Sequence, residues 1–413
     1  MKKSVRPSTA NGSIVAPPSK SIAQRAIAIA SMALGQSEIV STGSSHDVIA
    51  AITVCKALGA KIDVKPDRLF ISGGLSLPKN PLNCGESGLG IRMFSSIAAT
   101  LDGEVTLTGQ GSLLNRPMNI IEDSLRPLCE MCRTNNGKLP VVVKGPLKGG
   151  MVSVDGSISS QVLSGILIAS PYAKKDVIVK VDNLQSRPYI DVTIGVMKIF
   201  GVEVDNRNYS EFGVKAGQLY QPRTYTVEGD WSGATFMLVA GAIAGKVKVE
   251  NLQLNSSQAD RAIINALIYA GAMVSMHDNH VEVSKHQLNG FDFDATHCPD
   301  LFPPLVALAS HCDGESKILG VSRLRVKESD RAVTLMDEFV KMGVDVKVEG
   351  ELMIVKGRAV HSAQVNSNGD HRIAMAVAIA ALAGEGTIEI DGAESVSKSY
   401  PNFFEDLEKV RDK

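Results

Sequence analysis

The feature that most constrains the fold of this sequence is an internal repeat. An apolar, alanine-rich segment that ends in turn-forming residues and leads into a β-branched strand occurs six times. The six turns lie at Gly35, Gly103, Lys175, Gly245, Gly314 and Glu385, so the spacing between successive copies is nearly constant. A fixed period of this kind, here about 70 residues, indicates repeated supersecondary units.

A second marker, in which a helix end is followed by glycine and then by a strand, supports this period. It occurs at Gly59, Gly201, Gly271 and Gly343, so the first step spans two periods and the later steps span one each. The missing copy is expected near residue 130, where LRPLCEMCRTNNGKLPVVVKG is compatible with a degenerate helix and strand. Each unit therefore has a βαβαββ-type pattern of helices and strands.

The two chain ends are expected to share the sixth unit. YPNFFEDLEKVRDK has the pattern of a last helix that no strand follows, and the N-terminal SVRPSTANGSIVAP can supply the missing strand. We therefore expect two domains of three units each, one formed by residues 1–18 with 229–413 and the other by residues 19–228. Linkers are expected near 16–19 and 225–230, and the functional site in the cleft between the domains.

The repeated helices are apolar nearly all round. IRMFSSIAATL, TFMLVAGAIAG, LFPPLVALAS and RIAMAVAIAAL have no wide polar face, and a helix of this kind is buried. The expected fold class is therefore α/β, with helices inside and sheets outside, and with alanine and glycine allowing the helices to approach closely.

Charge and composition exclude several classes of partner. With 43 Lys and Arg against 44 Asp and Glu, the net charge is −1, so there is no general attraction to nucleic acid or to an anionic membrane. The start MKKSVRPSTANGS has no apolar segment typical of a signal peptide, and the uncharged stretch from Gly156 to Ala173 is interrupted by serines and a glutamine. We expect a cytoplasmic monomer without nucleic-acid or membrane partners.

Neither a metal nor a nucleotide cofactor is indicated. Cys129-x-x-Cys132 has no second pair, and His277-x-x-His280 has no suitably spaced third ligand and is interpreted as a surface turn. AGAIAGK lacks the spacing of a phosphate-binding loop, and GQGSLLN lacks the third glycine of a dinucleotide-binding motif.

Polar and cationic residues gather where the apolar helices begin. PPSKSIAQR places Ser19, Lys20, Ser21 and Arg25 in the first turns of the first helix. Cations are unfavourable at this positive end of a helix, so the pattern indicates a site for a bound anion. The alternative is that Ser19 merely caps the helix and that both bases are solvated.

The same arrangement recurs in the later units, and together the clusters predict two ligands with phosphate or carboxylate groups. The residues of these later clusters are Arg92, Arg116, Ser159, Ser160, Gln161, Ser186, Arg187, Tyr189, Asp300, Arg323, Arg325, Lys327, Glu328, Arg331, His371, Arg372 and Lys398.

Eight motifs along nearly the whole chain carry a resemblance to a known family. PSKSIAQR, NCGESGLGIR, NRPM, SSQ, SRPYID, RVKESDR, GDHR and KSYP occur in the order seen in the enolpyruvyl transferases, and most resemble the branch that acts on shikimate 3-phosphate. The resemblance implies an inverse α/β barrel of two domains with three repeats each. It also implies transfer of the enolpyruvyl group of phosphoenolpyruvate to the 5-hydroxyl of shikimate 3-phosphate, with release of phosphate, on the shikimate route to chorismate and aromatic amino acids.

The resemblance also implies roles for individual residues. It implies that the reaction needs no cofactor. Asp300, Glu328 and Lys20 would be catalytic. Shikimate 3-phosphate would be bound by Lys20, Ser21, Arg25, Ser159, Ser160, Gln161, Ser186, Asp300, Arg323 and Lys327. Phosphoenolpyruvate would be bound by Lys20, Gly88, Arg92, Arg116, Gln161, Arg331, Arg372 and Lys398.

The sequence departs from the family pattern in two informative places. Where the family loop often has Asn-Ala-Gly-Thr or Asn-Ser-Gly-Thr, this chain has Glu86-Ser87-Gly88-Leu89, which introduces a carboxylate and removes a hydroxyl. Arg323 stands where many relatives have asparagine.

Three alternatives are open at this point. The sibling branch that uses UDP-N-acetylglucosamine carries a reactive cysteine before its Arg-Pro pair, and GQGSLLNRPM has none. A six-unit clamp for DNA would need a basic inner stripe, which the near-zero net charge argues against. A relative that binds ligands without turnover is argued against only by the retained motifs.

Overall fold

The structure is a computed structural model, and it describes residues 1–157, 159–325 and 327–412. Its internal contacts divide the chain into two compact units. Unit 1 consists of Met1–Pro17 and Glu228–Lys413, and unit 2 consists of Pro18–Val227. Unit 2 is thus one continuous segment, whereas unit 1 is assembled from two.

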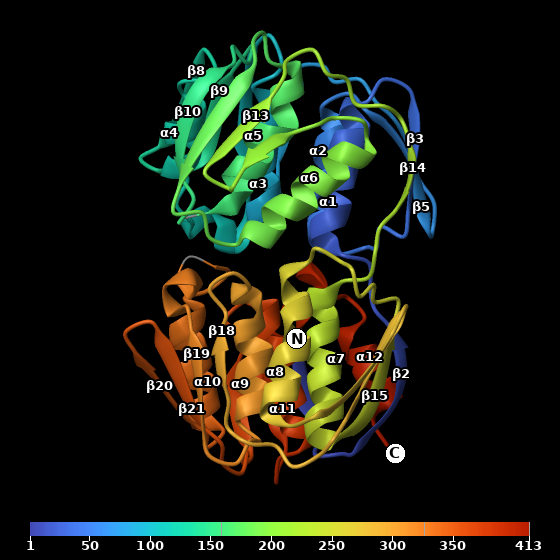
Figure 1. Ribbon diagram of the computed structural model, residues 1–413, viewed down its shortest axis with the longest axis vertical. Coiled ribbons are helices and arrows are strands. Elements are labelled where there is room, and N and C mark those ends of the chain that lie inside the picture. Colours follow the sequence, from blue (N-terminus) through green and yellow to red (C-terminus); the bar gives the residue numbers. More distant parts are fainter. Residues whose placement is uncertain (158, 326, 413) are drawn as a thin grey trace. The chain divides into compact units, whose positions relative to one another are not determined.

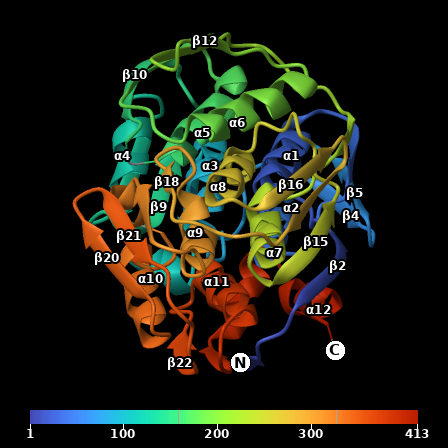
Figure 2. The same ribbon diagram turned by 60° about the horizontal axis from the view of Figure 1, so that its bottom comes forward.

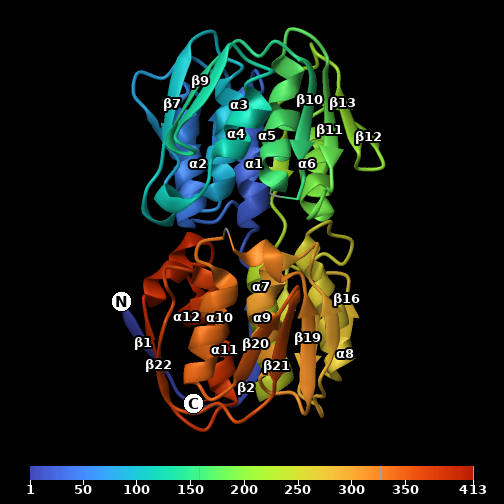
Figure 3. The ribbon, with the colours of Figure 1, turned by 90° about the vertical axis from the view of Figure 1, so that its left-hand side faces the viewer.

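The helices of unit 2 form an enclosed set and a half-buried set (Figures 1 and 3). The enclosed helices are α1 (Lys20–Met32), α3 (Gly88–Ala98) and α5 (Ser160–Ala169). The half-buried helices are α2 (His46–Ala57), α4 (Asn119–Leu125) and α6 (Arg187–Ile199). Helices α3 and α5 approach closely at Gly165, where a Cβ atom would lie 2.8 Å from the Arg92 carbonyl oxygen. This contact brings the first turns of the two helices together.

Sheets cover the helices of unit 2 (Figure 3). One sheet has the order β14-β3-β5-β4, with strands Thr224–Thr226, Gln36–Val40, Arg68–Ser72 and Lys61–Val64. The second has the order β6-β7-β9-β8, with strands Leu82–Asn83, Glu104–Thr108, Lys138–Lys144 and Met131–Asn135. The third has the order β10-β11-β13-β12, with strands Gly150–Asp155, Val177–Asp182, Glu211–Val214 and Asp205–Arg207. In each, the first pair is parallel and the others are antiparallel. Tyr225, at the start of an expected linker, lies in β14.

Unit 1 repeats the same design. Its enclosed helices are α7 (Trp231–Ala244), α9 (Phe302–Ala309) and α11 (His371–Leu382). Its half-buried helices are α8 (Ile263–Ala270), α10 (Arg331–Lys341) and α12 (Phe403–Val410). Figure 2 shows β15 beside α7 and β20 beside α10, in agreement with the residue contacts.

The sheets of unit 1 combine strands of the N-terminal segment with strands of the last three repeats. The first has the order β16-β17-β15-β2, with strands Met273–His277, His280–Ser284, Gly245–Glu250 and Ala10–Val15. The second has the order β18-β19-β21-β20, with strands Asp292–Asp294, Glu315–Leu319, Leu352–Lys356 and Asp345–Glu349. The third has the order β1-β23-β22, with strands Lys2–Val5, Ile388–Asp391 and Ala363–Asn366.

The N-terminal segment supplies two strands, where one was expected. Strand β1 pairs antiparallel with β23 of the sixth repeat, as expected, and β2 pairs parallel with β15 of the fourth. Residues 6–9 separate the two strands, and Ala10–Val15 pairs in a different sheet from Lys2–Val5.

The sequence predictions for the repeated elements are confirmed. The apolar helices α3, α7, α9 and α11 are buried, and the degenerate copy near residue 130 is α4 followed by β8 and β9. Of the helices in the described ranges, none has the length and apolarity needed to cross a membrane.

Candidate active site

The first turn of α1 is not capped in the ordinary way. The Ser19 side chain precedes the helix but accepts no hydrogen bond from it, and its Oγ atom is buried without a partner. Lys20 Nζ lies 3.0 Å from Asp47 Oδ2 at the start of α2. Because Ser19 does not cap and Arg25 is only 1% exposed, the alternative of a capped helix with solvated bases is wrong.

Arg25 is a buried cation held by neutral oxygen atoms. Its guanidinium donates to Thr193 Oγ1 at 2.8 Å, to Ser21 Oγ at 2.6 Å, to Ser164 Oγ at 3.3 Å and to the carbonyls of Ser21 and Tyr189 at 2.9 and 3.4 Å. Burial lowers the pKa of Arg25 to about 10. A buried charge without a compensating anion is costly, so this arrangement favours binding of an anionic ligand.

A second cationic group lies where α3 and α5 begin. Arg92 Nη1 donates to the Gly88 carbonyl at 3.0 Å and to Gln161 Oε1 at 3.1 Å. Arg116 packs on the backbone of Gly88, since a Cβ atom at that position would lie 2.3 Å from Arg116 Nη1. Four of the residues expected to bind phosphoenolpyruvate therefore lie together: Gly88, Arg92, Arg116 and Gln161.

Serine hydroxyls occupy the starts of α5 and α6. Ser159 is the N-cap of α5, and its Oγ accepts from the Gln161 backbone N–H at 3.2 Å, while Ser160 is the first helical residue. Ser186 precedes α6 in a left-handed conformation with φ of 56°. Such a conformation is strained for a residue other than glycine and is often found at functional sites.

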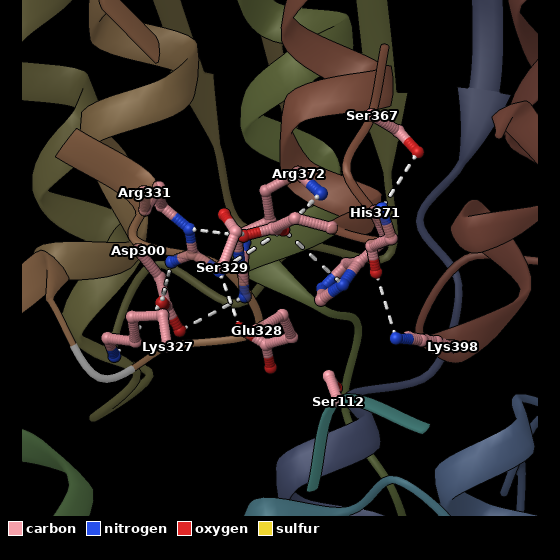
Figure 4. A network of polar contacts seen from close by, with 12 residues as sticks. Ser112, Asp300, Lys327, Glu328, Ser329, Arg331, Ser367, His371, Arg372 and Lys398 are labelled. Carbon is pink, nitrogen blue, oxygen red and sulfur yellow. Dashed lines mark hydrogen bonds and ion pairs between the residues drawn. The ribbon is translucent and has the colours of Figure 1, made fainter. Parts of the chain in front are cut away.

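The carboxylate of Asp300 lies among three cations of unit 1 (Figure 4). Its oxygen atoms are 3.3 Å from Lys327 Nζ, 2.9 Å from Arg331 Nη1 and 3.1 Å from Arg372 Nη2. Burial by itself would raise the pKa of Asp300, but Arg372, Lys327 and Arg331 outweigh it and hold that pKa well below its usual range. In this arrangement Asp300 is a stable anion and a weak base.

Arg331 joins Asp300 to two further carboxylates, of which Glu328 is labelled in Figure 4. It donates to Glu328 Oε2 at 2.7 Å and to Asp370 Oδ2 at 2.9 Å, and its side chain is 0% exposed. Burial opposes its charge, but the facing carboxylates of Asp370, Glu328 and Asp300 raise the pKa of Arg331.

Two predicted residues lie at the edge of this group. Lys398, at the end of a 3₁₀ turn, donates to the Gly369 carbonyl at 2.8 Å, beside the start of α11. Arg323 lies half-buried in the 3₁₀ turn Val321–Leu324, and its charge contributes to lowering the pKa of Lys327, after burial and Arg331.

Comparison with known proteins decides the family. A family model described as EPSP synthase (3-phosphoshikimate 1-carboxyvinyltransferase) matches residues 5–407. The chain belongs to the EPSP synthase family. A 3-phosphoshikimate 1-carboxyvinyltransferase of Methanocorpusculum labreanum is 39% identical over 99% of this chain and 98% of its own length. The protein of that name from Clostridium novyi is 37% identical over 98% of this chain and 96% of its own length.

Solved structures of EPSP synthases share the fold. That of Acinetobacter baumannii, at 2.37 Å, superposes with a TM-score of 0.84 and 26% identity, and covers 99% of this chain and 98% of its own. The resemblance to the enolpyruvyl transferases and the predicted α/β fold class are therefore confirmed. The chain is a carboxyvinyl-transferring enzyme by family, whereas the roles of individual residues stay predictions.

Sequence reasoning missed three carboxylates that the EPSP synthase fold brings beside predicted residues. Asp47 pairs with Lys20, Asp370 pairs with Arg331, and Asp260 lies 1% exposed near Asp300 and Arg372. Burial, and then the charge of Asp300, raises the pKa of Asp260 to about 7. The repeat could have signalled Asp260, since Asp260-Arg261-Ala262 lies one period of the repeat before Asp330-Arg331-Ala332.

The histidine pair lies away from these clusters. His277 and His280 flank the turn between β16 and β17, with their rings stacked at 4.3 Å, so the interpretation as a turn is confirmed. Within the described ranges, no group of three or more potential metal ligands is found.

Proposed function

We propose that this chain transfers the enolpyruvyl group of phosphoenolpyruvate to the 5-hydroxyl of shikimate 3-phosphate and releases phosphate, as its family does. The observation that carries the residue-level proposal is the Asp300 carboxylate held by Lys327, Arg331 and Arg372. It combines a candidate base with cations that suit phosphate and carboxylate groups.

Shikimate 3-phosphate is bound chiefly through hydroxyl and cationic groups. The start of α5 suits its phosphate, because Ser159 and Ser160 lie where a helix has unpaired N–H groups. Ser186 and Arg323 serve the same phosphate. The ring hydroxyls and carboxylate are bound by Lys20, Ser21, Arg25, Gln161, Asp300 and Lys327.

Phosphoenolpyruvate is bound by the cationic group of unit 2 and by cations of unit 1. The cluster of Gly88, Arg92, Arg116 and Gln161 supports this assignment, and Lys20, Arg372 and Lys398 complete it. Arg331 is enclosed by Asp300, Glu328 and Asp370, so we assign it chiefly to holding these carboxylates. We propose that residues of both units act on the same pair of substrates.

The reaction proceeds by addition and then elimination. Asp300 takes the proton of the 5-hydroxyl while the hydroxyl oxygen bonds to C2 of phosphoenolpyruvate. At the same time Glu328 gives a proton to C3. In the resulting tetrahedral intermediate, Glu328 takes a proton back from the methyl carbon, the C2–C3 double bond forms and the C2–phosphate bond breaks. The proton that Asp300 took leaves with the released phosphate, whose charge Lys20 neutralises. Such acid and base groups typically contribute about 10²–10⁴-fold each.

Substrate binding itself prepares Asp300 for this role. Lys327 and Arg372 are assigned to substrate anions, yet in the structure described here both contact Asp300. When the substrates take over these cations, the pKa of Asp300 rises towards that of a useful base. Asp300 therefore becomes an effective base only when the two anionic substrates are bound.

Phosphate release from phosphoenolpyruvate by the purified protein tests the function. We expect release with shikimate 3-phosphate as acceptor and none with UDP-N-acetylglucosamine. Release only with the latter would assign the chain to the sibling branch, and binding of shikimate 3-phosphate without release would indicate a non-catalytic relative. The monomeric state and the cytoplasmic location stay predictions.

A further inference from the structure

Two loops of unit 2 are joined beside the phosphoenolpyruvate residues. The first loop, residues 83–87, leads into α3, and the second, residues 109–116, follows β7. The Gln110 backbone N–H donates to the Gly85 carbonyl at 2.8 Å. A Cβ atom at Gly109 would lie 2.9 Å from the same carbonyl oxygen, so the two backbones are in close contact.

Glu86 adds a side-chain link between these loops. Its Oε2 atom accepts from both the backbone N–H and the hydroxyl of Ser112, each at 2.9 Å. The carboxylate also packs on Gly111, whose φ is 56° and where a Cβ atom would lie 2.3 Å from Glu86 Cδ. The second loop is thus shaped to receive this carboxylate, which is the one that departs from the family pattern.

The turn that Glu86 holds leads directly to Arg116. Ser112 belongs to the 3₁₀ turn Gly111–Asn115, and the Arg116 backbone N–H donates to the Leu113 carbonyl at 3.2 Å. At its other end, the Arg116 guanidinium packs on Gly88, just after Glu86 in the chain. Arg92 Nη2 further donates to the Pro117 carbonyl at 3.4 Å. The main chain before Arg116 is therefore held by Glu86 through Ser112, and the main chain after it is held by Arg92 of α3.

We propose that Glu86 is a positioning residue for phosphoenolpyruvate binding, which holds the 111–116 turn so that Arg116 meets the substrate. The inference rests on the proposed role of Arg116 in that binding. Its effect comes from the two hydrogen bonds to Ser112, because a carboxylate near arginines would by its charge alone oppose an anionic substrate. The two effects have opposite signs and can be separated by substitution.

The test compares Glu86→Ala, which removes the acceptor, with Glu86→Gln, which removes the charge and keeps an acceptor oxygen. For Glu86→Ala we expect the KM for phosphoenolpyruvate to rise about tenfold, with kcat and the KM for shikimate 3-phosphate within about twofold of the wild type. Glu86→Gln should stay within about twofold of the wild type in kcat and in both KM values.

Ser112→Ala removes one of the two hydrogen bonds to Glu86 and should raise the KM for phosphoenolpyruvate about threefold. The double variant Glu86→Ala/Ser112→Ala should resemble Glu86→Ala, because both changes remove the same interaction.

Three results would overturn the inference: a lower KM for phosphoenolpyruvate in both Glu86 variants, an equal rise in both KM values, or no change in Glu86→Ala. Thermal unfolding of each variant checks that the fold is retained.

Arg116→Ala separates this inference from the function on which it rests. A large rise in the KM for phosphoenolpyruvate in Arg116→Ala supports the assignment of Arg116, so that a silent Glu86→Ala then overturns the positioning role alone. An unchanged KM in Arg116→Ala overturns the assignment and the inference together.

Discussion

The two units hold several of their predicted site cations in different ways. In unit 2, Arg25 and Arg92 donate to hydroxyl, carbonyl and amide oxygens. In unit 1, Lys327, Arg331 and Arg372 contact carboxylates, with Asp300 common to all three. Lys20 of unit 2 differs from Arg25, because it contacts the Asp47 carboxylate.

This difference separates two tasks of an enzyme with anionic substrates. A cation held by neutral oxygens, as Arg25 is, keeps its full charge for the ligand, so this part of unit 2 is prepared for binding. Cations held by carboxylates must change partners before they bind a ligand, so in unit 1 binding is coupled to the state of the candidate base. A cation whose charge is available before binding favours affinity. A cation that must leave a carboxylate when the ligand binds can control the reactivity of that carboxylate.

The largest effect is expected from Asp300→Asn. Turnover should fall by about 10²–10⁴-fold, because the base for the 5-hydroxyl is lost. Calorimetry should show binding of shikimate 3-phosphate within about threefold of the wild type, since asparagine can still hydrogen-bond a ring hydroxyl and Lys327 and Arg372 lose a competing anion. Asp292→Asn, an exposed change on nearby β18, is the control and should be silent. Near-normal turnover in Asp300→Asn would disprove the assignment, and Glu328→Gln tests its proposed partner in the same assay.

The comparison of the units is sharpened by removing one charge from each. Arg25→Met should raise the Kd for shikimate 3-phosphate about 100-fold, because its charge has no carboxylate partner among the contacts described for it. Lys327→Met should raise the same Kd less than about tenfold, because that lysine is already neutralised by Asp300. Calorimetry measures both, with circular dichroism to check folding. Equal losses in the two variants would remove the distinction drawn between the units.

The pH dependence of stability tests the buried carboxylates of unit 1. The pKa of Asp260 is raised in the folded state, to about 7, so its contribution to stability is present at low pH and is lost as pH rises through that value. Between about pH 5 and pH 7.5 the wild type should lose roughly 2 kcal/mol relative to Asp260→Asn. Asparagine can still accept from Ser232, which contacts Asp260. Urea unfolding at the two pH values measures the difference, and parallel behaviour of the two proteins would show that Asp260 does not titrate in this range.

The smallest effect concerns the strained start of α6. Ser186→Gly and Ser186→Ala both remove the hydroxyl and should both raise the KM for shikimate 3-phosphate. Only glycine relieves the left-handed backbone, so Ser186→Gly should be more stable than Ser186→Ala by about 1 kcal/mol. Chemical denaturation gives this difference. Equal stabilities would indicate that the conformation carries no strain.

The sequence was sufficient for the architecture and for most of the cationic residues. Its fixed period and the apolar helices predicted the repeats, and cations at helix starts drew attention to Arg25, Arg92 and Arg372, because these residue types are unusual in such positions. The alternative of a solvated Arg25 failed because periodicity does not show which charged residues the neighbouring helices enclose.

The partners of these residues could not be predicted in the same way. Asp300 and Arg372 come from different repeats, and Glu86 and Ser112 are joined only because two loops meet beside one sheet. Asp260 was missed because a single acidic residue in a sequence is most often exposed. The positions of the repeated elements can thus be predicted from the sequence. Side-chain pairing depends on loops that differ from one repeat to the next.

The two strands supplied by residues 2–15 also set an order on how the protein can form as it is synthesised. Unit 2 is one continuous segment and can fold as soon as Val227 has left the ribosome. Strand β2 must wait for β15, and β1 must wait for β23, which is made later still. Until then both are unpaired edges of the kind that associate with other chains. Unit 1 is therefore the half of the newborn protein most exposed to aggregation, and the half whose assembly should depend most on chaperones.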